Sequence, residues 1–413
     1  MENPMSLFAK TPPALLWAAL LLAFGGACEP FGDTPAELGW SIADSAGVRI
    51  VTNQNGTDIP EAFRISPVSL LDLGGDRGGS SAELNPRHSD VGVARLSDGR
   101  FVVSDWQHIK VFGPDGDFQM LMGGPGEGPG EFTNLRTVCV VTGDTIVAVD
   151  GRARVSVFTE DGQHVRTFQA LEAGRFAGGS CRTDGSLLFK GIRQPNPAST
   201  LPAEIAGQID PVVEVRWVHV DSRAPSFLGL FPDGMLGPWF PSRGNVVAHE
   251  DEVFVGSGKG AEVRVYSERG AFKGVIRWDE PVTQVTDRLL AEVVQQMQPR
   301  GAPASEFERD LNRARQFPQP EALPVYETIR VDEAGRLWVQ DYFLSSPQPQ
   351  PWIVFDSEGV LLGKVLLPEL PGASFLDVRS VSSSQIFLRW KDEVGFSHLT
   401  LHAFEPIGER NTF

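Results

Sequence analysis

The chain has 413 residues, of which 41% are apolar, and it carries a formal net charge of −17. This composition suffices for a large core and excludes a low-complexity disordered chain, while 44 Gly and 31 Pro predict frequent turns. The acidic charge argues against nucleic acid as a partner, because no cluster of Lys and Arg is long enough to offset the repulsion of a phosphate backbone.

Residues 1–27 predict a signal peptide. Lys10 precedes an apolar run over residues 14–27, which is shorter than the roughly 20 residues that a membrane-spanning helix needs. The small residues before Cys28 resemble the lipobox of bacterial lipoproteins, in which the cysteine is acylated and becomes the first mature residue. Lipidation of Cys28, ordinary cleavage near Ala27 and an uncleaved anchor all remain open. We expect an exported protein, a periplasmic or cell-surface lipoprotein of a bacterium that is bound to the membrane by its lipid anchor only.

Two segments separate the signal peptide from the first repeat. Residues 28–62 are expected to form a tether and leading segment, whose polar beginning suits a link between a lipid and a fold. Residues 63–75, FRISPVSLLDLGG, predict a β-strand.

An internal repeat begins at Val91. The stretch VGVARLSDGRFVVSDWQHIKVFGPDGDFQMLMG predicts four strands separated by tight turns, which make one antiparallel meander. Alternation supports the strands, because Phe101 and Val103 point to one face of the sheet and Val102 and Ser104 to the other. Further copies begin at Thr137, Gly179, Asn245, Glu327 and Phe375.

These copies predict an all-β fold, a six-bladed β-propeller over residues 63–406, followed by a tail at 407–413. The last copy stops after three strands, which would leave an exposed sheet edge. The predicted strand at 63–75 can supply the fourth strand and so close the ring. The first turns of the copies fall near Asp98, Gly143, Asp184, Glu250, Ala334 and Ser383.

A helical insertion at about 283–317 is predicted between blades 4 and 5. Thr286 can cap a first helix with apolar residues at spacings of three and four, and Ser305 and Glu308 can form the capping box of a second helix. We expect the two helices to lay an apolar stripe on one propeller face, and a lid over the channel mouth is the alternative.

Three cysteines are present, and with Cys28 lipidated only Cys139 and Cys181 could form a disulfide in an oxidising compartment. Both fall on predicted inner strands of neighbouring blades, which radiate from an axis. We therefore expect their Cα atoms to lie beyond the roughly 7 Å limit for bridging, and both thiols to pack as small hydrophobic groups.

The most distinctive string is GGPGEGPGEF at residues 123–132. Its backbone N–H groups could cradle an anion, but no Lys-Ser/Thr follows as in a P-loop, and its position indicates a link between two blades. Together with DSAGVRIVTN at 44–53 and LPVYETIRVDEAGRLWV at 323–339, the string resembles a family of bacterial exported six-bladed β-propellers related to NHL repeats. The resemblance covers roughly residues 40–406. It implies the fold and a lipid-anchored or exported location, but no particular reaction.

Repeats of this kind favour Asp after the second strand of each blade. This chain has Asp105, Asp150 and Asp341 at such positions, but Gly256 and Trp390 in two other blades. A regular ring of Asp side chains is therefore interrupted.

Ligands of propellers usually lie where the inner strands start around the central channel. Alignment of the copies on their first turns predicts these ligand-binding residues at the channel mouth: His88, Asp90, Asn134, Arg136, Arg243, Tyr326, Glu327 and Asp377. Their mixed charges suit a small polar ligand or an ion. We expect no cofactor, and the alternative is Ca²⁺ held by the carboxylates of Asp90, Glu327 and Asp377, as in lactonases of the gluconolactonase type. Such enzymes also need Asn side chains, and only Asn134 is near.

The main hypothesis is a monomeric, non-catalytic scaffold that binds a protein, peptide or glycan in the cell envelope. The alternative is a metal-dependent lactonase- or lyase-like enzyme, and a third hypothesis is a structural partner in an envelope complex. Convergence of Asp90, Glu327 and Asp377 within about 5 Å of one point would favour the enzyme, because Ca²⁺ needs close oxygen ligands. Pairing of these carboxylates with Arg136 or Arg243 would favour the scaffold.

Overall fold

The computed structural model describes residues 39–407, apart from 56–58, 76–78, 80, 86–90, 172–179, 194–211, 233–238, 241, 243, 299–300, 344–350 and 375. The predicted signal peptide and Cys28 lie outside the described residues, as do residues 408–413. The described chain belongs to one compact unit, Glu37–Phe413. Within this part of the chain, no helix has the length and hydropathy that crossing a membrane requires.

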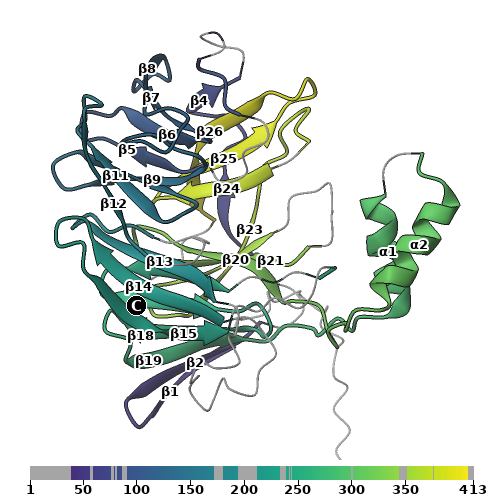
Figure 1. Ribbon diagram of the computed structural model, residues 1–413. Helices are drawn as coiled ribbons and strands as arrows, with labels where there is room; N and C mark the ends of the chain where they lie inside the picture. The colour runs from purple at the N-terminus through teal and green to yellow at the C-terminus, as the bar shows by residue number, and fades with distance from the viewer. Residues whose placement is uncertain are drawn as a thin grey trace, which may run out of the picture. The chain divides into compact units, whose positions relative to one another are not determined.

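The repeat that begins at Val91 forms antiparallel four-stranded sheets in meander order (Figure 1). Blade 1 consists of β5 (Val93–Arg95), β6 (Phe101–Asp105), β7 (His108–Phe112) and β8 (Phe118–Met122). Blade 2 consists of β9 (Leu135–Val141), β10 (Thr145–Asp150), β11 (Arg154–Phe158) and β12 (His164–Gln169). In each blade the first strand lies innermost and the fourth outermost.

Blades 3 and 4 keep this order but differ at their edges. Blade 3 consists of β13 (Ser186–Arg193), β14 (Val212–His219) and β15 (Pro225–Pro232), and its inner strand is reduced to a bridge between Cys181 and Leu187. Blade 4 consists of β16 (Asn245–His249), β17 (Glu252–Gly256), β18 (Glu262–Ser267) and β19 (Phe272–Trp278).

Blades 5 and 6 complete the set of six blades formed by the described strands. Blade 5 consists of β20 (Tyr326–Val331), β21 (Leu337–Asp341), β22 (Trp352–Phe355) and β23 (Leu361–Leu366). Blade 6 contains β24 (Leu376–Val381), β25 (Gln385–Lys391) and β26 (Ser397–Pro406).

The ring closes where the N-terminal part of the chain meets the last blade, as predicted. β4 (Leu71–Gly74) pairs antiparallel with β26, so that Leu73 lies opposite Leu399. β3 (Glu61–Ile65) pairs with the end of β26 and, in parallel, with β23. The single strand expected over 63–75 is therefore two strands, because the chain bends between them.

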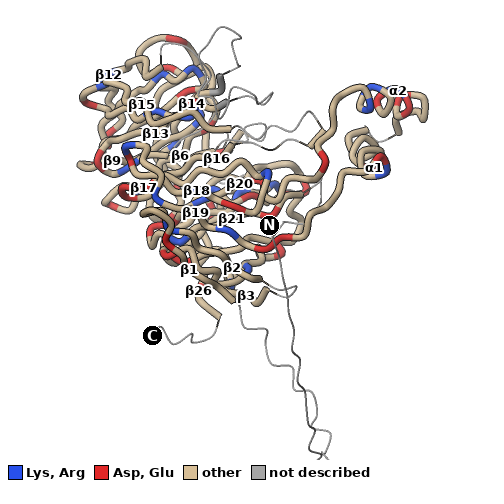
Figure 2. The backbone as a smooth tube through the Cα atoms, turned by 90° about the horizontal axis from the view of Figure 1, so that it is seen from below, with Lys and Arg blue, Asp and Glu red and all other residues tan. Residues whose placement is uncertain are grey.

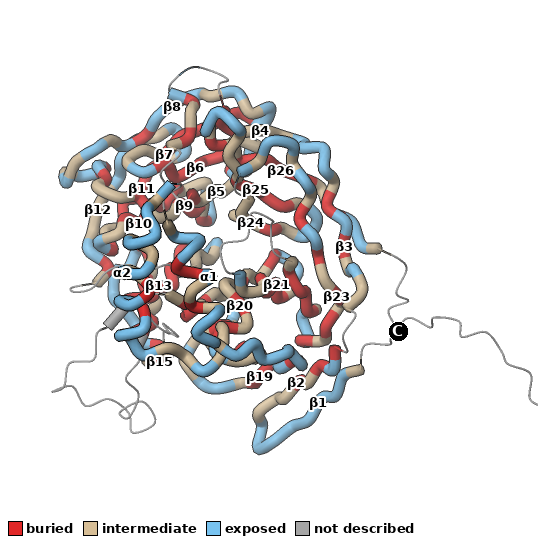
Figure 3. Tube along the Cα trace, turned by 90° about the vertical axis from the view of Figure 1, so that its right-hand side faces the viewer, coloured by how far each residue is buried: buried red, intermediate tan, exposed pale blue. Residues whose placement is uncertain are grey.

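Each pair of neighbouring blades shares a separate hydrophobic core. In blade 2, Val147 and Val149 pack against blade 3, whereas Ile146 and Ala148 pack against blade 1, as the period of two requires. Such clusters lie between all six neighbouring pairs of blades among the described residues. The buried segments therefore run along the strands around the ring (Figure 3). Burying each Val or Leu side chain contributes about 1.5–3 kcal/mol, so these clusters hold the blades together.

A hairpin of β1 (Gly39–Ser45) and β2 (Val48–Gln54) extends blade 4 outward. β2 runs parallel to β19, and Asn53 links it to blade 5 by donating to the Gly359 carbonyl and accepting from the Leu361 N–H. The sequence places this hairpin in the leading segment at residues 28–62. In the structure it belongs to the compact unit of the propeller.

The insertion between blades 4 and 5 forms α1 (Asp287–Met297) and α2 (Ala304–Ala314). Thr286 caps α1 as predicted, by accepting a hydrogen bond from the Leu289 N–H. The capping box predicted for α2 is absent, because this helix begins at Ala304 with Pro303 at its N-cap and Ser305 already lies in the first turn. We expected the apolar stripe to lie on one propeller face. It packs instead between the two helices and against Trp239 and Phe240 of the connection between blades 3 and 4.

Cys139 and Cys181 form a disulfide, which contradicts the expectation that they stay apart. Their Cα atoms are 6.2 Å apart, within the range that a disulfide can bridge. Both residues belong to the core between blades 2 and 3. Neighbouring blades diverge toward their outer strands but converge at their inner strands. Because these cysteines lie at the inner strands, their Cα atoms are closer than the divergence of the blades suggests.

Candidate functional site

Of the eight residues predicted at the channel mouth, His88, Asp90 and Arg243 lie outside the described residues. The other five belong to the inner strands or directly precede them, namely Asn134, Arg136, Tyr326, Glu327 and Asp377. The structure brings some of these together and separates others.

Asn134 and Arg136 lie together beside Gly151, at the start of the inner strand of blade 2. The Asn134 carbonyl accepts the Gly151 N–H at 2.8 Å. A Cβ atom on Gly151 would lie 3.3 Å from Asn134 Nδ2 and 3.4 Å from Arg136 Nε, so glycine leaves room for both polar groups. The Oδ1 atom of Asn134 is enclosed and has no hydrogen-bond partner in the part of the chain that the structure describes.

Tyr326 does not join the other predicted residues, because it is part of the core between blades 4 and 5. The residue is 1% exposed, and its hydroxyl donates to the Glu262 carbonyl at 3.0 Å. Burial raises the pKa of Tyr326. The hydroxyl fills the space beside Gly256, where a Cβ atom would lie 2.0 Å from it. This packing explains why the series of Asp residues is interrupted at Gly256.

An acidic group that the sequence did not reveal lies at the same end of blade 5 as Glu327. Burial and, to a smaller extent, the charge of the nearby Glu280 together raise the pKa of Asp341 to about 7. Burial also raises the pKa of Glu280. The pKa of Tyr342 is raised by burial first and then by the charge of Glu327. The sequence indicates Asp341 only as a position of the repeat. Its interaction with Glu280 could not be predicted, because Glu280 lies in the connection between β19 and α1, which is distant in the chain.

Asp377 is held by an arginine of its own strand. Its carboxylate accepts from Arg379 Nη1 at 2.7 Å, and Arg379 Nε donates to the Val91 carbonyl at 2.7 Å. The partner that the described residues show for Asp377 is therefore Arg379, and Arg243 lies outside the described residues. The predicted cation ligands Glu327 and Asp377 belong to different blades, and no three His, Cys, Asp or Glu side chains of the described residues gather as metal ligands.

Three arginines near Asp377 escaped the sequence analysis. Arg330 lies on β20, Arg379 on β24, and Arg389 on β25 directly opposite Asp377. Alternation was the available signal, because Arg330 follows the buried Ile329 and Arg379 follows the buried Val378. The alignment on first turns selected only strand starts, and these arginines lie further along the strands or on the second strand.

A polar cleft of about 640 Å³ opens between blades 4 and 5 at the other end of the inner strands. The turns that follow β16 and β20 contribute to its lining, together with β2 and β19. Arg49 in this cleft pairs with Glu358 at 2.6 Å, and Lys273 pairs with Glu252. Arg49 and Lys273 are thus already neutralised by carboxylates. The cleft is therefore a weaker candidate for a ligand-binding site than the arginines near Asp377.

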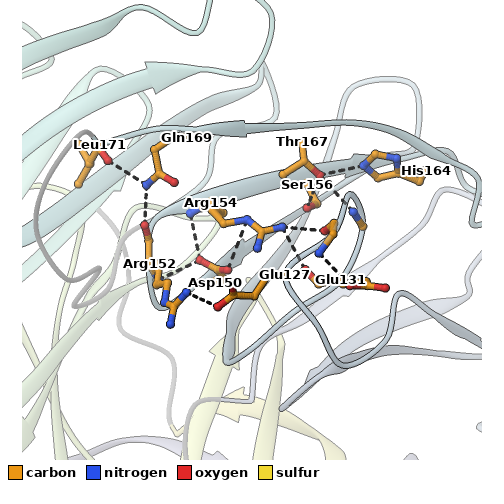
Figure 4. A network of polar contacts seen from close by, with 12 residues as sticks. Glu127, Glu131, Asp150, Arg152, Arg154, Ser156, His164, Thr167, Gln169 and Leu171 are labelled. Atoms are coloured by element: carbon orange, nitrogen blue, oxygen red, sulfur yellow. Dashed lines mark hydrogen bonds and ion pairs between the residues drawn. The ribbon is translucent and has the colours of Figure 1, made fainter.

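The glycine-rich string is a joint between blades 1 and 2 rather than an anion cradle (Figure 4). Gly128 N–H donates to the Glu131 carboxylate, and Gly130 N–H donates to Thr167. Arg154 donates to the Gly128 carbonyl. Phe132, which is 1% exposed, anchors the string in the core between these blades. The string thus links β8 to β9, as its position indicated.

Comparisons with known proteins give the fold. No family model and no curated protein match the chain. A Bacteroides vulgatus protein of a family of unknown function is 8% identical, with a TM-score of 0.53 over 84% of this chain and 99% of that chain. A candidate exported protein of Bacteroides fragilis is 14% identical, with a TM-score of 0.49 over 87% of this chain and 100% of that chain. A Xanthomonas campestris gluconolactonase is 15% identical, with a TM-score of 0.41 over 85% and 98%. At 8% identity the likeness to the Bacteroides vulgatus protein extends to the fold alone, and the sheets of the described residues show that this fold is a β-propeller.

Proposed function

We propose that this protein is an exported, non-catalytic propeller that binds a protein, peptide or glycan ligand in the cell envelope. The observation that carries the proposal is the ion pair between Asp377 and Arg379, with 2.7 Å between nitrogen and oxygen. A carboxylate that binds Ca²⁺ must place its oxygen about 2.3–2.6 Å from the metal, free of a competing cation. Asp377 is instead neutralised by a guanidinium, which suits a polar binding surface.

The export part of the proposal has two supports. The apolar run before Cys28 predicts a signal peptide, and the Cys139–Cys181 disulfide suits an oxidising compartment outside the cytoplasm. We include lipid attachment at Cys28 in the proposal. Expression of Cys28→Ser in a bacterial host tests it, since the variant should leave the membrane fraction while the wild-type chain stays there.

The binding proposal is tested with the full-length protein purified in detergent. Soluble peptidoglycan fragments and envelope polysaccharides are added in a thermal-shift titration, in which a ligand of the native state must raise the melting temperature. We expect a saturable increase with at least one of them and no change with Ca²⁺ or a chelator. Failure of every such ligand would contradict the scaffold.

The enzyme alternative has its own test on the same preparation. Hydrolysis of sugar lactones is followed with and without chelator, in the wild type and in Asp377→Asn. Asp161→Asn, which changes an exposed residue on the outer turn of blade 2, is the control. Chelator-sensitive hydrolysis that only Asp377→Asn abolishes would replace the scaffold by a metal-dependent enzyme.

A further inference from the structure

Arg330 lies at the inner edge of blade 5 and faces blade 6. It is paired across β20 and β21 with Trp338, which is fully buried in the core between these two blades. Directly opposed residues of paired strands project from the same face, so Arg330 projects toward blade 6. Its neighbour Ile329 points the other way, into the core between blades 4 and 5. Figure 3 shows β20 and β24, the inner strands of blades 5 and 6, next to each other near the centre of the ring.

Arg330 has no hydrogen-bond acceptor for its Nε in the described part of the chain. Its Nε is enclosed and makes no hydrogen bond to any residue in the described ranges, although the residue as a whole is partly exposed. Guanidinium nitrogens are strong donors, and an enclosed donor without an acceptor costs about 1–3 kcal/mol or more when it is charged. Arginines in protein interiors are accordingly almost always paired, so Arg330 departs from the usual pattern.

Asp377 compensates the charge of Arg330 only in part. This carboxylate is bound by Arg379, and the next strand places the 2%-exposed Arg389 opposite it. Burial first, and then the charge of Arg379, lower the pKa of Arg330 to about 10, a value in which Asp377 already offsets part of the shift. Two guanidinium groups, those of Arg330 and Arg379, thus lie near the one carboxylate of Asp377, and only Arg379 is paired with it.

These two arginines contrast with the acidic composition of the chain as a whole. The protein carries 53 Asp and Glu against 36 Lys and Arg. Figure 2 shows basic residues interspersed with acidic residues along the chain. A local excess of arginine at the inner edge of two blades is therefore not a consequence of composition. Such an excess favours an anion at this point over a neutral or cationic group.

We infer that the inner edge between blades 5 and 6 binds an oxyanion, a carboxylate or phosphate group carried by the envelope ligand, with Arg330 as its main donor and Arg379 beside it. The inference rests on the proposed scaffold function and specifies the ligand class. Guanidinium matches both oxyanions, because its planar donors can bind two oxygens at once. Lys at this position would supply the charge without that geometry.

The test uses three sugars that share one ring: glucuronate, glucose 6-phosphate and glucose. They are titrated into the full-length protein by isothermal calorimetry, in the wild type and in Arg330→Gln. Arg309→Gln, which removes an exposed arginine of α2, is the matched control. We expect glucuronate or glucose 6-phosphate to bind, glucose not to bind, and Arg330→Gln to weaken binding at least tenfold. The anion that binds identifies the carboxylate or the phosphate as the ligand group.

Two further measurements separate a binding role from a structural one. Arg330→Lys should lose part of the affinity while it keeps the charge, and added NaCl should weaken binding by the wild type more than by Arg330→Gln. Equal binding of glucose and the anionic sugars, no response to either anion up to its solubility limit, or unchanged affinity in a folded Arg330→Gln protein would overturn the inference.

The outcomes also distinguish this inference from the scaffold proposal. If an envelope fragment still raises the melting temperature of Arg330→Gln as it does for the wild type, the scaffold stands and the oxyanion site is wrong. If no envelope fragment binds but a sugar anion binds through Arg330, the site stands and the scaffold is wrong.

Discussion

His398 and Asp72 meet across the seam at which the propeller closes, with His398 Nδ1 lying 3.0 Å from an Asp72 carboxylate oxygen. The two residues belong to β26 and β4, whose pairing joins the N-terminal strand to the last blade. The His398 ring stacks on Trp390, with 4.2 Å between centroids, and Asp392 lies 3.5 Å from its Nε2. The hydrogen bond to Asp72, with a further contribution from Asp392, raises the pKa of His398 above its ordinary value.

The seam should lose stability as the pH rises. The folded pKa of His398 exceeds its unfolded value near 6.5, so the pair contributes fully below about pH 6.5 and is lost as the pH passes the raised pKa. Asp72→Asn should therefore lower the free energy of unfolding by about 1 kcal/mol near pH 6 and by less near pH 9. Urea unfolding at both pH values measures the effect, with Asp161→Asn as control. Equal losses at the two pH values would show that the pair does not titrate.

Replacing Asp341 should stabilise the protein, whereas replacing Asp72 should destabilise it. Its pKa of about 7 lies above the unfolded value of 3.8, so the native state retains a proton that the unfolded chain has already released. Stability should therefore fall as the pH rises from about 4 to 7. Asp341→Asn should remove this fall and increase the free energy of unfolding near pH 8 by about 2 kcal/mol, a value reduced because the residue is partly exposed. Denaturant unfolding near pH 5 and pH 8 checks this. A variant that is no more stable than the wild type near pH 8 would contradict the assignment.

The fold could be predicted from sequence because each blade repeats the same local signals. Strand alternation and turn residues such as Asp98 and Asp184 act within a few residues, and six copies reinforce one another. Closure was predictable because a three-stranded last blade lacks a neighbour. The division of the closing segment into β3 and β4 was missed, since it depends on where β26 and β23 lie in space.

The site was predicted less well, because it depends on contacts between distant segments. Aligning strand starts predicted that Asn134 and Arg136 lie near each other, and both lie beside Gly151. The same alignment assigned Tyr326 to the channel mouth. In the structure Tyr326 turns into the core between blades 4 and 5, because Gly256 has no side chain and leaves space for its ring. Arg330 was missed because the alignment selected only strand starts, whereas Arg330 lies further along β20.

The Cys139–Cys181 disulfide should stabilise the contact between blades 2 and 3. It joins residues 42 apart in sequence, and a bridge of this span typically contributes about 2–4 kcal/mol. The double variant Cys139→Ala with Cys181→Ala should unfold at lower temperature than the wild type, and reductant should lower the wild-type value toward that of the variant without affecting the variant. Thiol titration of the unfolded wild type should detect both cysteines only after reduction. Their reaction without reductant would show that the bridge is not formed.

Gly256→Ala tests the packing of Tyr326 between blades 4 and 5. The new Cβ would lie 2.0 Å from the Tyr326 hydroxyl, so the ring must shift and its hydrogen bond to Glu262 must weaken. We expect a loss of about 1–3 kcal/mol in the free energy of unfolding, as is typical of overpacked cores. Gly260→Ala, whose Cβ would meet nothing within 4 Å, is the control in the same blade.

Tyr326→Phe provides the decisive comparison, because it removes the atom that collides. Alone, it should cost about 1 kcal/mol through the lost hydrogen bond to Glu262. Combined with Gly256→Ala, it should recover part of the stability, since the new Cβ would lie 3.0 Å from the nearest ring carbon. Losses that simply add in the double variant would mean that Gly256 is required for its backbone and not for the space it leaves to Tyr326.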